Sequence, residues 1–284
     1  MTPQQYCREK ALHSGSCLHY SLRFLPVVQR HALLALYAFF REIKEISYLS
    51  QHASDAKFHW WLGEIRHTFA GTPSHPVCQA LVEPIARYQL QLHYFEEIIE
   101  SMFRHMDVTR YSTFADLEQY CQSTSSVLSL LCTQVGGYQN ENTLKYAEQL
   151  GIALQLTYFL RNIRKDIRRG YLYIPQEDLK EFQVPEIELL NIQSSELIQS
   201  LFAYQTVRIR AYYHEAFKCL PKEDQKKQQS SIVHAQLILA TLKEIELDGY
   251  QLFSHSIHLP PLRKIWITGQ TLWQIRKGQV EYYE

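Results

Sequence analysis

Residues 142–170 read NTLKYAEQLGIALQLTYFLRNIRKDIRRG, and this stretch decides the fold. It opens on Asn142 and Thr143, residue types that favour helix starts. Apolar residues then recur at spacings of three and four as far as Arg169. Gly170 follows, as glycine commonly does after a last helical turn. The pattern predicts one long helix around which the rest of the chain can pack.

Helical spacing continues on both sides of this stretch. After Pro26, apolar residues recur at helical spacing from Leu33 to Ile46, and Ser112 and Thr113 open a pattern that Gly136 and Gly137 end. Further helices are expected over residues 58–69, 76–90, 94–106, 186–220, 223–247 and 261–276. Strand-like alternation of useful length is absent. We therefore predict an all-α protein with one domain over residues 1–284 and roughly ten helices.

The composition fits a helical protein with a sizeable core. Hydrophobic residues make up 46% of the 284 residues, and only 10 glycines and 10 prolines interrupt them. Lys plus Arg and Asp plus Glu both number 29, which argues against a nucleic-acid-binding protein, because such proteins normally carry a basic excess. The six cysteines form no C-x-x-C pair and are expected to be reduced thiols of a cytoplasmic protein.

The sequence gives no sign of a membrane-spanning segment. The N-terminal residues MTPQQYCREKALHSGS lack the apolar block of a signal peptide. The longest apolar run, residues 232–242, is too short to cross a bilayer. The segment LRKIWITGQTLWQIRK, residues 262–277, combines Trp, Ile, Lys and Arg in a manner suited to a membrane interface, but a final helix packed on the bundle is the favoured interpretation. We expect a cytoplasmic protein, at most peripheral to the inner membrane.

Polar residues form stripes on two of the expected helices. In YAFFREIKEISYLS, residues 37–50, the stripe holds Tyr37, Arg41, Lys44, Glu45 and Tyr48. On the long helix it holds Gln155, Tyr158, Asn162, Asp166 and Arg169. The stripes are either solvated charged faces or the two walls of a polar pocket, in which buried charge must be paired with a ligand or with opposite charge.

The order of these segments resembles the squalene/phytoene synthase family, nearest to its bacterial presqualene diphosphate synthase members. The resemblance runs almost end to end. It is carried by YCREKALHSGSCLHYSLRFLP (residues 6–26), LLALYAFFREIKEI (33–46), DLEQYCQSTSS (116–126), LGIALQLTYFLRNIRKDIRRGYLYIPQEDL (150–179), RAYYHEAFKCLP (210–221) and PLRKIW (261–266). The long match at 150–179 is the most specific, because it fixes many positions in order.

The resemblance implies an all-α, isoprenoid synthase-type helical bundle around a central cavity. It also implies head-to-head condensation of two prenyl diphosphates, here farnesyl diphosphate to presqualene diphosphate or squalene. In such enzymes two Asp-rich helices hold Mg²⁺ ions that grip the diphosphates and neutralise the departing charge.

The metal positions of this sequence depart from the pattern that it resembles. The three acids of the first Asp-rich motif fall on Lys44, Glu45 and Tyr48. In the second motif, Asn, Asp and Asp fall on Tyr158, Asn162 and Asp166. The resemblance therefore leaves Glu45, Asn162 and Asp166 as candidate metal ligands, and Lys44 brings a positive charge to the place where metals would lie.

Other positions keep the residue types that the resemblance assigns to substrate or chemistry. The candidate substrate-binding residues are Ser14, Ser16, Tyr37, Arg41, Gln155 and Arg161. The candidate catalytic residues are Tyr120 and Tyr173, although both also suit a simple aromatic core. The opposite charges at the two motifs further suggest ion pairs in place of metals, either Lys44 with Asp166 or Lys165 with Glu45.

Two functions of different classes follow. The first is an Mg²⁺-dependent prenyltransferase of the farnesyl-diphosphate farnesyltransferase type. The second is a catalytically silent relative without a cofactor, which binds a prenyl lipid or acts as an assembly or interaction protein. The eroded metal positions favour the second.

Overall fold

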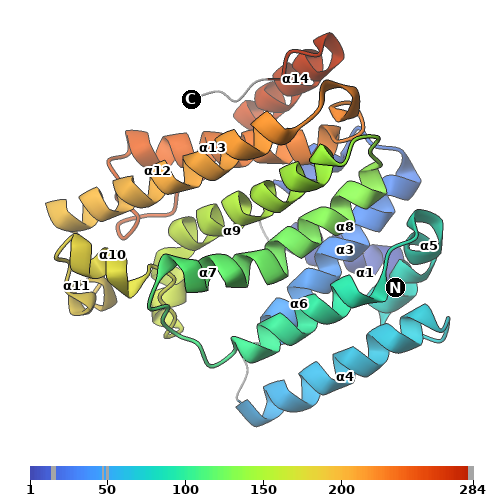
Figure 1. The fold of residues 1–284 in the computed structure, drawn as a ribbon, viewed down its shortest axis with the longest axis horizontal. Coiled ribbons are helices and arrows are strands. Elements are labelled where there is room, and N and C mark those ends of the chain that lie inside the picture. Colours follow the sequence, from blue (N-terminus) through green and yellow to red (C-terminus); the bar gives the residue numbers. More distant parts are fainter. Residues whose placement is uncertain (14–16, 47, 49–50, 281–284) are drawn as a thin grey trace.

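The computed structural model describes residues 1–13, 17–46, 48 and 51–280, and in this part every named element is a helix (Figure 1). The helices are α1 (Pro3–His13), α2 (Leu18–Leu22), α3 (Val27–Ile46), α4 (Gln51–Phe69), α5 (Pro76–Tyr88), α6 (Leu92–Arg104), α7 (Phe114–Cys121), the π-helical turn η1 (Gln122–Ser126), α8 (Val127–Gly136), α9 (Asn142–Arg168), α10 (Gln176–Glu181), α11 (Glu186–Leu190), α12 (Glu196–Cys219), the 3₁₀ turn η2 (Lys222–Asp224), α13 (Gln229–Leu247) and α14 (Pro261–Lys277). The predicted all-α class is confirmed.

Helix α9 occupies the middle of the bundle (Figure 1). It contacts α12, α13, α7, η1 and α8, and α4 and α14 lie at opposite edges of the molecule (Figure 1). Buried residues form two clusters. One contains the apolar residues of α9 with those of α12 and α13. The other joins α3, α4, α5, α6 and α8, with Phe39, Phe58 and Phe95 fully buried.

The start of α9 is held by a residue distant in the sequence, whereas its end depends on a local turn. Asp224, which is 0% exposed, accepts hydrogen bonds from the backbone N–H groups of Gln139 and Asn140 and from the Thr143 hydroxyl at 2.7 Å. A buried carboxylate thus satisfies donors at the start of the helix. At the other end Gly170 has φ +88°, a conformation that favours glycine.

Other predicted bounds need correction. The capped start at Thr113 is confirmed, because its hydroxyl and Asp116 form a capping box. A single helix over residues 186–220 is wrong: α11 ends at Leu190, Ile192 has φ +56°, and Ser195 caps a new helix by accepting from the Ile198 N–H. The expected helix over 223–247 begins only at Gln229, after η2.

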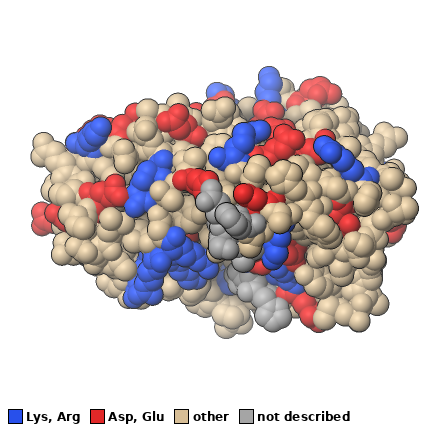
Figure 2. Space-filling model, turned by 90° about the horizontal axis from the view of Figure 1, so that it is seen from below, with Lys and Arg blue, Asp and Glu red and all other residues tan. Residues whose placement is uncertain are grey.

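Within the described residues, no helix is both long and apolar enough to cross a membrane. Positive and negative side chains are interspersed over the face in Figure 2, in line with the equal totals of 29 basic and 29 acidic residues.

The contact between α9 and η1 depends on a glycine. A Cβ atom on Gly151 would lie 2.4 Å from the Ser126 Cα and 2.7 Å from the Ser125 carbonyl oxygen. Backbone atoms cannot give way as a flexible side chain can. Gly151 therefore allows α9 to approach the π-helical turn closely.

We predict that Gly151→Ala lowers the free energy of unfolding by about 3 kcal/mol or more, because the added methyl group forces two backbones apart. Gly63→Ala is the matched control, since Gly63 is also helical and a Cβ there meets no atom within 4 Å. It should be neutral or stabilise by up to about 1 kcal/mol. Urea unfolding of both variants measures the difference. Equal effects of the two substitutions would contradict a close approach at Gly151.

Candidate functional site

The two polar stripes meet inside the bundle, where α3 faces α9. Lys44 is 5% exposed, and its Nζ lies 3.8 Å from the centroid of the Tyr158 ring and 5.6 Å from that of Phe159. Arg169 lies over the Tyr48 ring, 4.2 Å from its centroid. We call Lys44, Tyr48, Tyr158, Asp166 and Arg169 the lysine site. For Lys44, burial excludes the interpretation as a solvated charged face.

Lys44 and Asp166 interact electrostatically across this interface. Burial lowers the pKa of Lys44 to about 8, and the charge of Asp166 opposes this shift. Burial also raises the pKa of Asp166 to about 6, against the effects of Lys44, Arg169 and Lys165. The Asp166 Oδ2 atom is buried and accepts no hydrogen bond. The attraction matches the first of the two predicted charge pairs, and both groups are strongly desolvated.

Glu45 turns away from the lysine site. Its carboxylate contacts the Lys10 ammonium at 2.6 Å and the Arg41 guanidinium at 3.0 Å, and its side chain is 41% exposed. Lys10 also contacts Glu42 at 2.9 Å, so these pairs attach α1 to α3. Lys165 is exposed. The alternative pair of Lys165 with Glu45 is therefore wrong.

The candidate substrate-binding residues lie around the same helices. Tyr37 and Arg41 are one turn apart on α3 and partly buried, and the Arg41 Nε is buried without a hydrogen-bond partner. On α9, the Gln155 Oε1 accepts a 2.6 Å hydrogen bond from the Ser125 hydroxyl. Arg161 is partly buried, and with burial it lowers the pKa of His234 to about 4. Ser14 and Ser16 lie outside the described residues.

The candidate metal ligands are not brought together as a set. Asn162 uses its amide N–H to donate to the Tyr158 carbonyl oxygen at 2.8 Å. Asp166 has Lys44 and Arg169 as its charged neighbours, and Glu45 pairs with Lys10 and Arg41. Across the described ranges, no group of three or more His, Cys, Asp or Glu side chains is placed to hold a metal ion.

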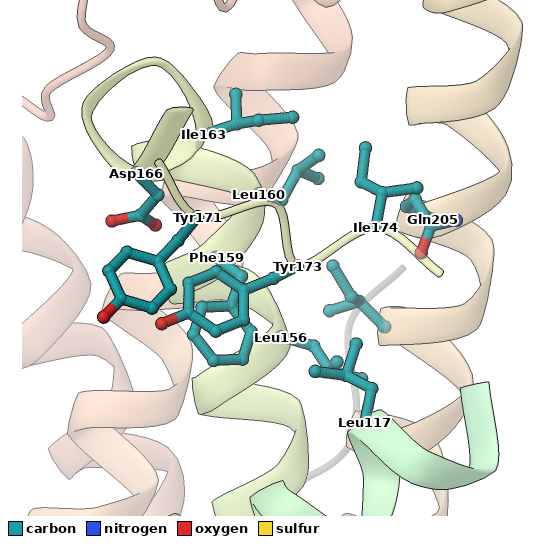
Figure 3. Close-up of a pocket in the computed structure, with 11 residues that line it drawn as sticks. Leu117, Leu156, Phe159, Leu160, Ile163, Asp166, Tyr171, Tyr173, Ile174 and Gln205 are labelled. Atoms are coloured by element: carbon teal, nitrogen blue, oxygen red, sulfur yellow. The ribbon is translucent and has the colours of Figure 1, made fainter. Parts of the chain in front are cut away.

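Aromatic rings line the region beside Asp166. Tyr173 stacks on Phe159, with ring centroids 3.7 Å apart and planes 10° apart (Figure 3). The centroid of the Tyr120 ring lies 6.4 Å from that of the same Phe159 ring. Burial raises the pKa of both candidate catalytic tyrosines, Tyr120 and Tyr173. Both are therefore neutral phenols near neutral pH.

A small cavity adjoins these rings. It has a volume of about 20 Å³ and is lined by Leu156, Phe159, Asp166, Tyr171 and Tyr173, among others (Figure 3). This is room for roughly one water molecule. A prenyl chain could occupy this region only if side chains moved aside.

Sequence reasoning missed several residues that shape the site. Phe159 contacts Lys44 and Tyr173 but falls between the polar positions of α9. Tyr111 packs near both Tyr120 and Tyr173. Lys10 neutralises Glu45 from 35 residues away in the sequence. Only the tertiary packing places these residues, so local spacing carried no signal for them.

We predict a pH signature for the buried pair. In the folded protein Asp166 keeps its proton up to about pH 6, whereas an unfolded Asp loses it near about pH 4. Its contribution to the free energy of unfolding therefore falls as pH rises through this window. Lys44 loses its proton near pH 8 when folded and near about pH 10 when unfolded. Its contribution therefore rises again between these values.

The measurement compares wild type with the Lys44→Met/Asp166→Asn double variant by urea unfolding from pH 4 to pH 10. Near pH 7 the double variant should be as stable as wild type or up to about 4 kcal/mol more stable, because neither charge is then buried. The difference should shrink towards both ends of the pH range. A difference that does not vary with pH would show that the two groups are not desolvated as described.

The family model described as squalene/phytoene synthase matches residues 13–264. The 15-cis-phytoene synthase of Synechococcus elongatus is 28% identical over 273 residues, which cover 91% of this chain and 89% of that protein. The phytoene synthase of Arthrospira platensis is 26% identical over 279 residues, which cover 92% of this chain and 89% of that protein.

Solved structures share the fold. A dehydrosqualene synthase crystallised with a ligand superposes with a TM-score of 0.87 at 21% identity, covering 97% of both chains. Squalene synthase HpnC from Alicyclobacillus acidocaldarius gives a TM-score of 0.73 at 21% identity, covering 87% of this chain and 94% of that chain. The family match over most of the chain and the shared helical fold together show that this chain belongs to the squalene/phytoene synthase family.

Proposed function

We propose that this protein binds a prenyl diphosphate, or a related phosphorylated isoprenoid lipid, without Mg²⁺ and without condensing it. The observation that carries the proposal is the buried ammonium group of Lys44, held against the Tyr158 ring and opposite Asp166. It lies on the helix where related synthases are expected to hold metal.

The lysine site is poorly suited to Mg²⁺. This ion needs hard oxygen ligands, usually one or two carboxylates together with substrate phosphates. Asp166 already faces Lys44 and Arg169, and Glu45 is engaged by Lys10 and Arg41. At an effective dielectric constant of about 20, an ammonium group ~4 Å from a divalent ion costs several kcal/mol. Magnesium must therefore displace or deprotonate Lys44 to bind there.

The cations in and around the lysine site suit an anion. Lys44, Arg41, Arg161 and Arg169 supply positive charge along the facing sides of α3 and α9. A guanidinium group binds phosphate oxygens in a bidentate manner. The aromatic rings of Tyr120, Phe159 and Tyr173 offer an apolar wall next to these cations. An anionic head with an apolar tail is the ligand class that fits both, and prenyl diphosphates belong to it.

The alternative is Mg²⁺-dependent condensation, which membership of the family and the retained Asp166 favour. The two functions differ in their need for metal. They also differ in whether a carbon–carbon bond forms between two prenyl groups. Ligand-dependent melting temperatures and product formation, each measured with and without Mg²⁺, therefore distinguish the two functions.

We predict that farnesyl or geranylgeranyl diphosphate raises the melting temperature equally with Mg²⁺ and with a chelator. At a hundred times its Kd, a ligand stabilises the folded state by about 2.7 kcal/mol, which corresponds to a rise of about 5 °C or more. Arg161→Gln should weaken the rise, whereas Arg87→Gln should not, since Arg87 is an exposed arginine on α5.

Turnover is measured on the same samples by incubation with labelled prenyl diphosphate and extraction of the products. No presqualene diphosphate, squalene or phytoene should form above the level of the chelated sample. A product whose formation requires Mg²⁺ would contradict the proposal and favour the synthase. An absence of stabilisation by either diphosphate would instead favour an assembly or interaction protein.

We also predict that Lys44→Asp alone does not create a functional metal site, because Tyr48 and Tyr158 still lack carboxylate or amide oxygens. The measurement is the Mg²⁺-dependent change in melting temperature, with and without diphosphate ligand. The triple variant Lys44→Asp/Tyr48→Asp/Tyr158→Asn is the comparison and should show a metal-dependent rise. Metal-dependent stabilisation of the single variant would mean that Lys44 is the sole obstacle to binding.

A further inference from the structure

A second hollow lies among the N-terminal helices, away from the lysine site. Its volume is about 240 Å³, many times the ~10–15 Å³ that one water needs. Its polar lining includes Arg8, Arg23, Arg30, His19 and His31. We call it the arginine pocket.

Helical spacing brings these side chains together. Gln4, Arg8, Ala11 and Leu12 occur at spacings that place them on one face of α1. His19, Leu22 and Arg23 come from α2 and its C-terminal end. Arg30, His31 and Leu34 come from the first half of α3. Arg30 precedes Lys44 by 14 residues on the same helix, a rise of about 21 Å. The arginine pocket is therefore a separate place from the lysine site.

Among the described residues, no carboxylate is paired with the guanidinium groups of the arginine pocket. The lining residues that the structure describes include no Asp or Glu. In the part of the chain that the structure describes, Arg8, Arg23 and Arg30 form no ion pair within 4.0 Å. Arginines elsewhere do pair, as Arg110 does with Glu186 at 2.6 Å and Arg210 with Glu246 at 2.7 Å. Three guanidinium groups around one hollow repel one another, and a bound anion removes this repulsion.

Apolar side chains accompany the basic ones. Leu12 lines the arginine pocket itself and is 51% exposed. Phe24 directly follows Arg23 and is 58% exposed, and Val27 and Val28 precede Arg30 with 54% and 38% exposure. A free phosphate ion gains no favourable contact from these apolar groups. A ligand with an anionic head and an apolar part uses both.

We propose that the arginine pocket binds the phosphate group of an anionic amphiphile, whose apolar part lies against Leu12, Phe24, Val27 and Val28. Arg23 and Arg30 donate charge-assisted hydrogen bonds to the phosphate oxygens, and the imidazoles of His19 and His31 donate further hydrogen bonds. The phosphate belongs either to the headgroup of a membrane lipid or to a soluble phosphorylated amphiphile. The proposal does not depend on ligand binding at the lysine site.

The test uses Arg23→Gln/Arg30→Gln with Arg87→Gln/Arg104→Gln as the matched control. The control removes the same charge from exposed arginines on α5 and α6, whose partners Glu83 and Glu100 lie 3.6 and 3.7 Å away. Melting temperatures without ligand establish that both variants fold. Sedimentation with phosphatidylcholine vesicles, with and without phosphatidylglycerol, tests the lipid headgroup. Titration with dodecyl phosphate below its micellar concentration tests the soluble source.

Binding of wild type to phosphatidylglycerol vesicles should fall about 30-fold in the pocket variant and stay unchanged in the control. If dodecyl phosphate stabilises wild type but not the pocket variant, and wild type does not bind the vesicles, the ligand is a soluble phosphorylated amphiphile instead of a membrane lipid. Phe24→Ser/Val27→Ser should weaken both kinds of binding while leaving the arginines in place. Equal binding by the pocket variant and the control, or no binding to either probe, overturns the proposal.

Discussion

The fold depends on the burial of one long helix. Helix α9 runs through the centre of the bundle, and neighbouring helices cover most of its length. Such a helix must approach its neighbours closely and must have its ends satisfied inside the protein. Gly151 allows the close approach because it leaves room for the backbone of η1. Asp224 serves the start of the helix because it accepts hydrogen bonds from backbone N–H groups just before α9. Gln155 and Asp166 of α9 are then held inside the molecule whether or not they are paired.

This burial gives the lysine site its character. On an exposed helix, Lys44 and Asp166 would each be solvated and of little consequence. Inside the bundle each shifts the pKa of the other, and the Tyr158 ring stabilises the ammonium group through a cation–π contact. Under the function proposed above, the buried ammonium group takes the place of a metal ion as the positive charge that faces the anionic head.

Much of the fold could be predicted from spacing and end signals, because these are local. The bounds of α9, the capping box at Thr113 and the start of α14 at Pro261 were expected and observed. The break between α11 and α12 was not expected, although residues 191–195 read NIQSS and Asn and Ser are common turn residues. Ile192 is the single apolar residue there, and its φ of +56° marks the turn. The approach of Lys44 to Asp166 was one of the two charge pairings that the stripes suggested, with solvated charged faces as the alternative. The diversion of Glu45 to Lys10 depends on how α1 packs, which no local pattern encodes.

The buried pair has an evolutionary consequence. Replacing Lys44 alone leaves Asp166 without its main opposing charge, and replacing Asp166 alone leaves a lysine in the interior without its carboxylate. Breaking a buried pair from one side costs several kcal/mol, whereas removing both charges together is close to neutral. Single substitutions that remove only one of the two charges therefore pass through less stable proteins. Stability itself thus opposes a stepwise exchange of these two residues and favours their joint replacement.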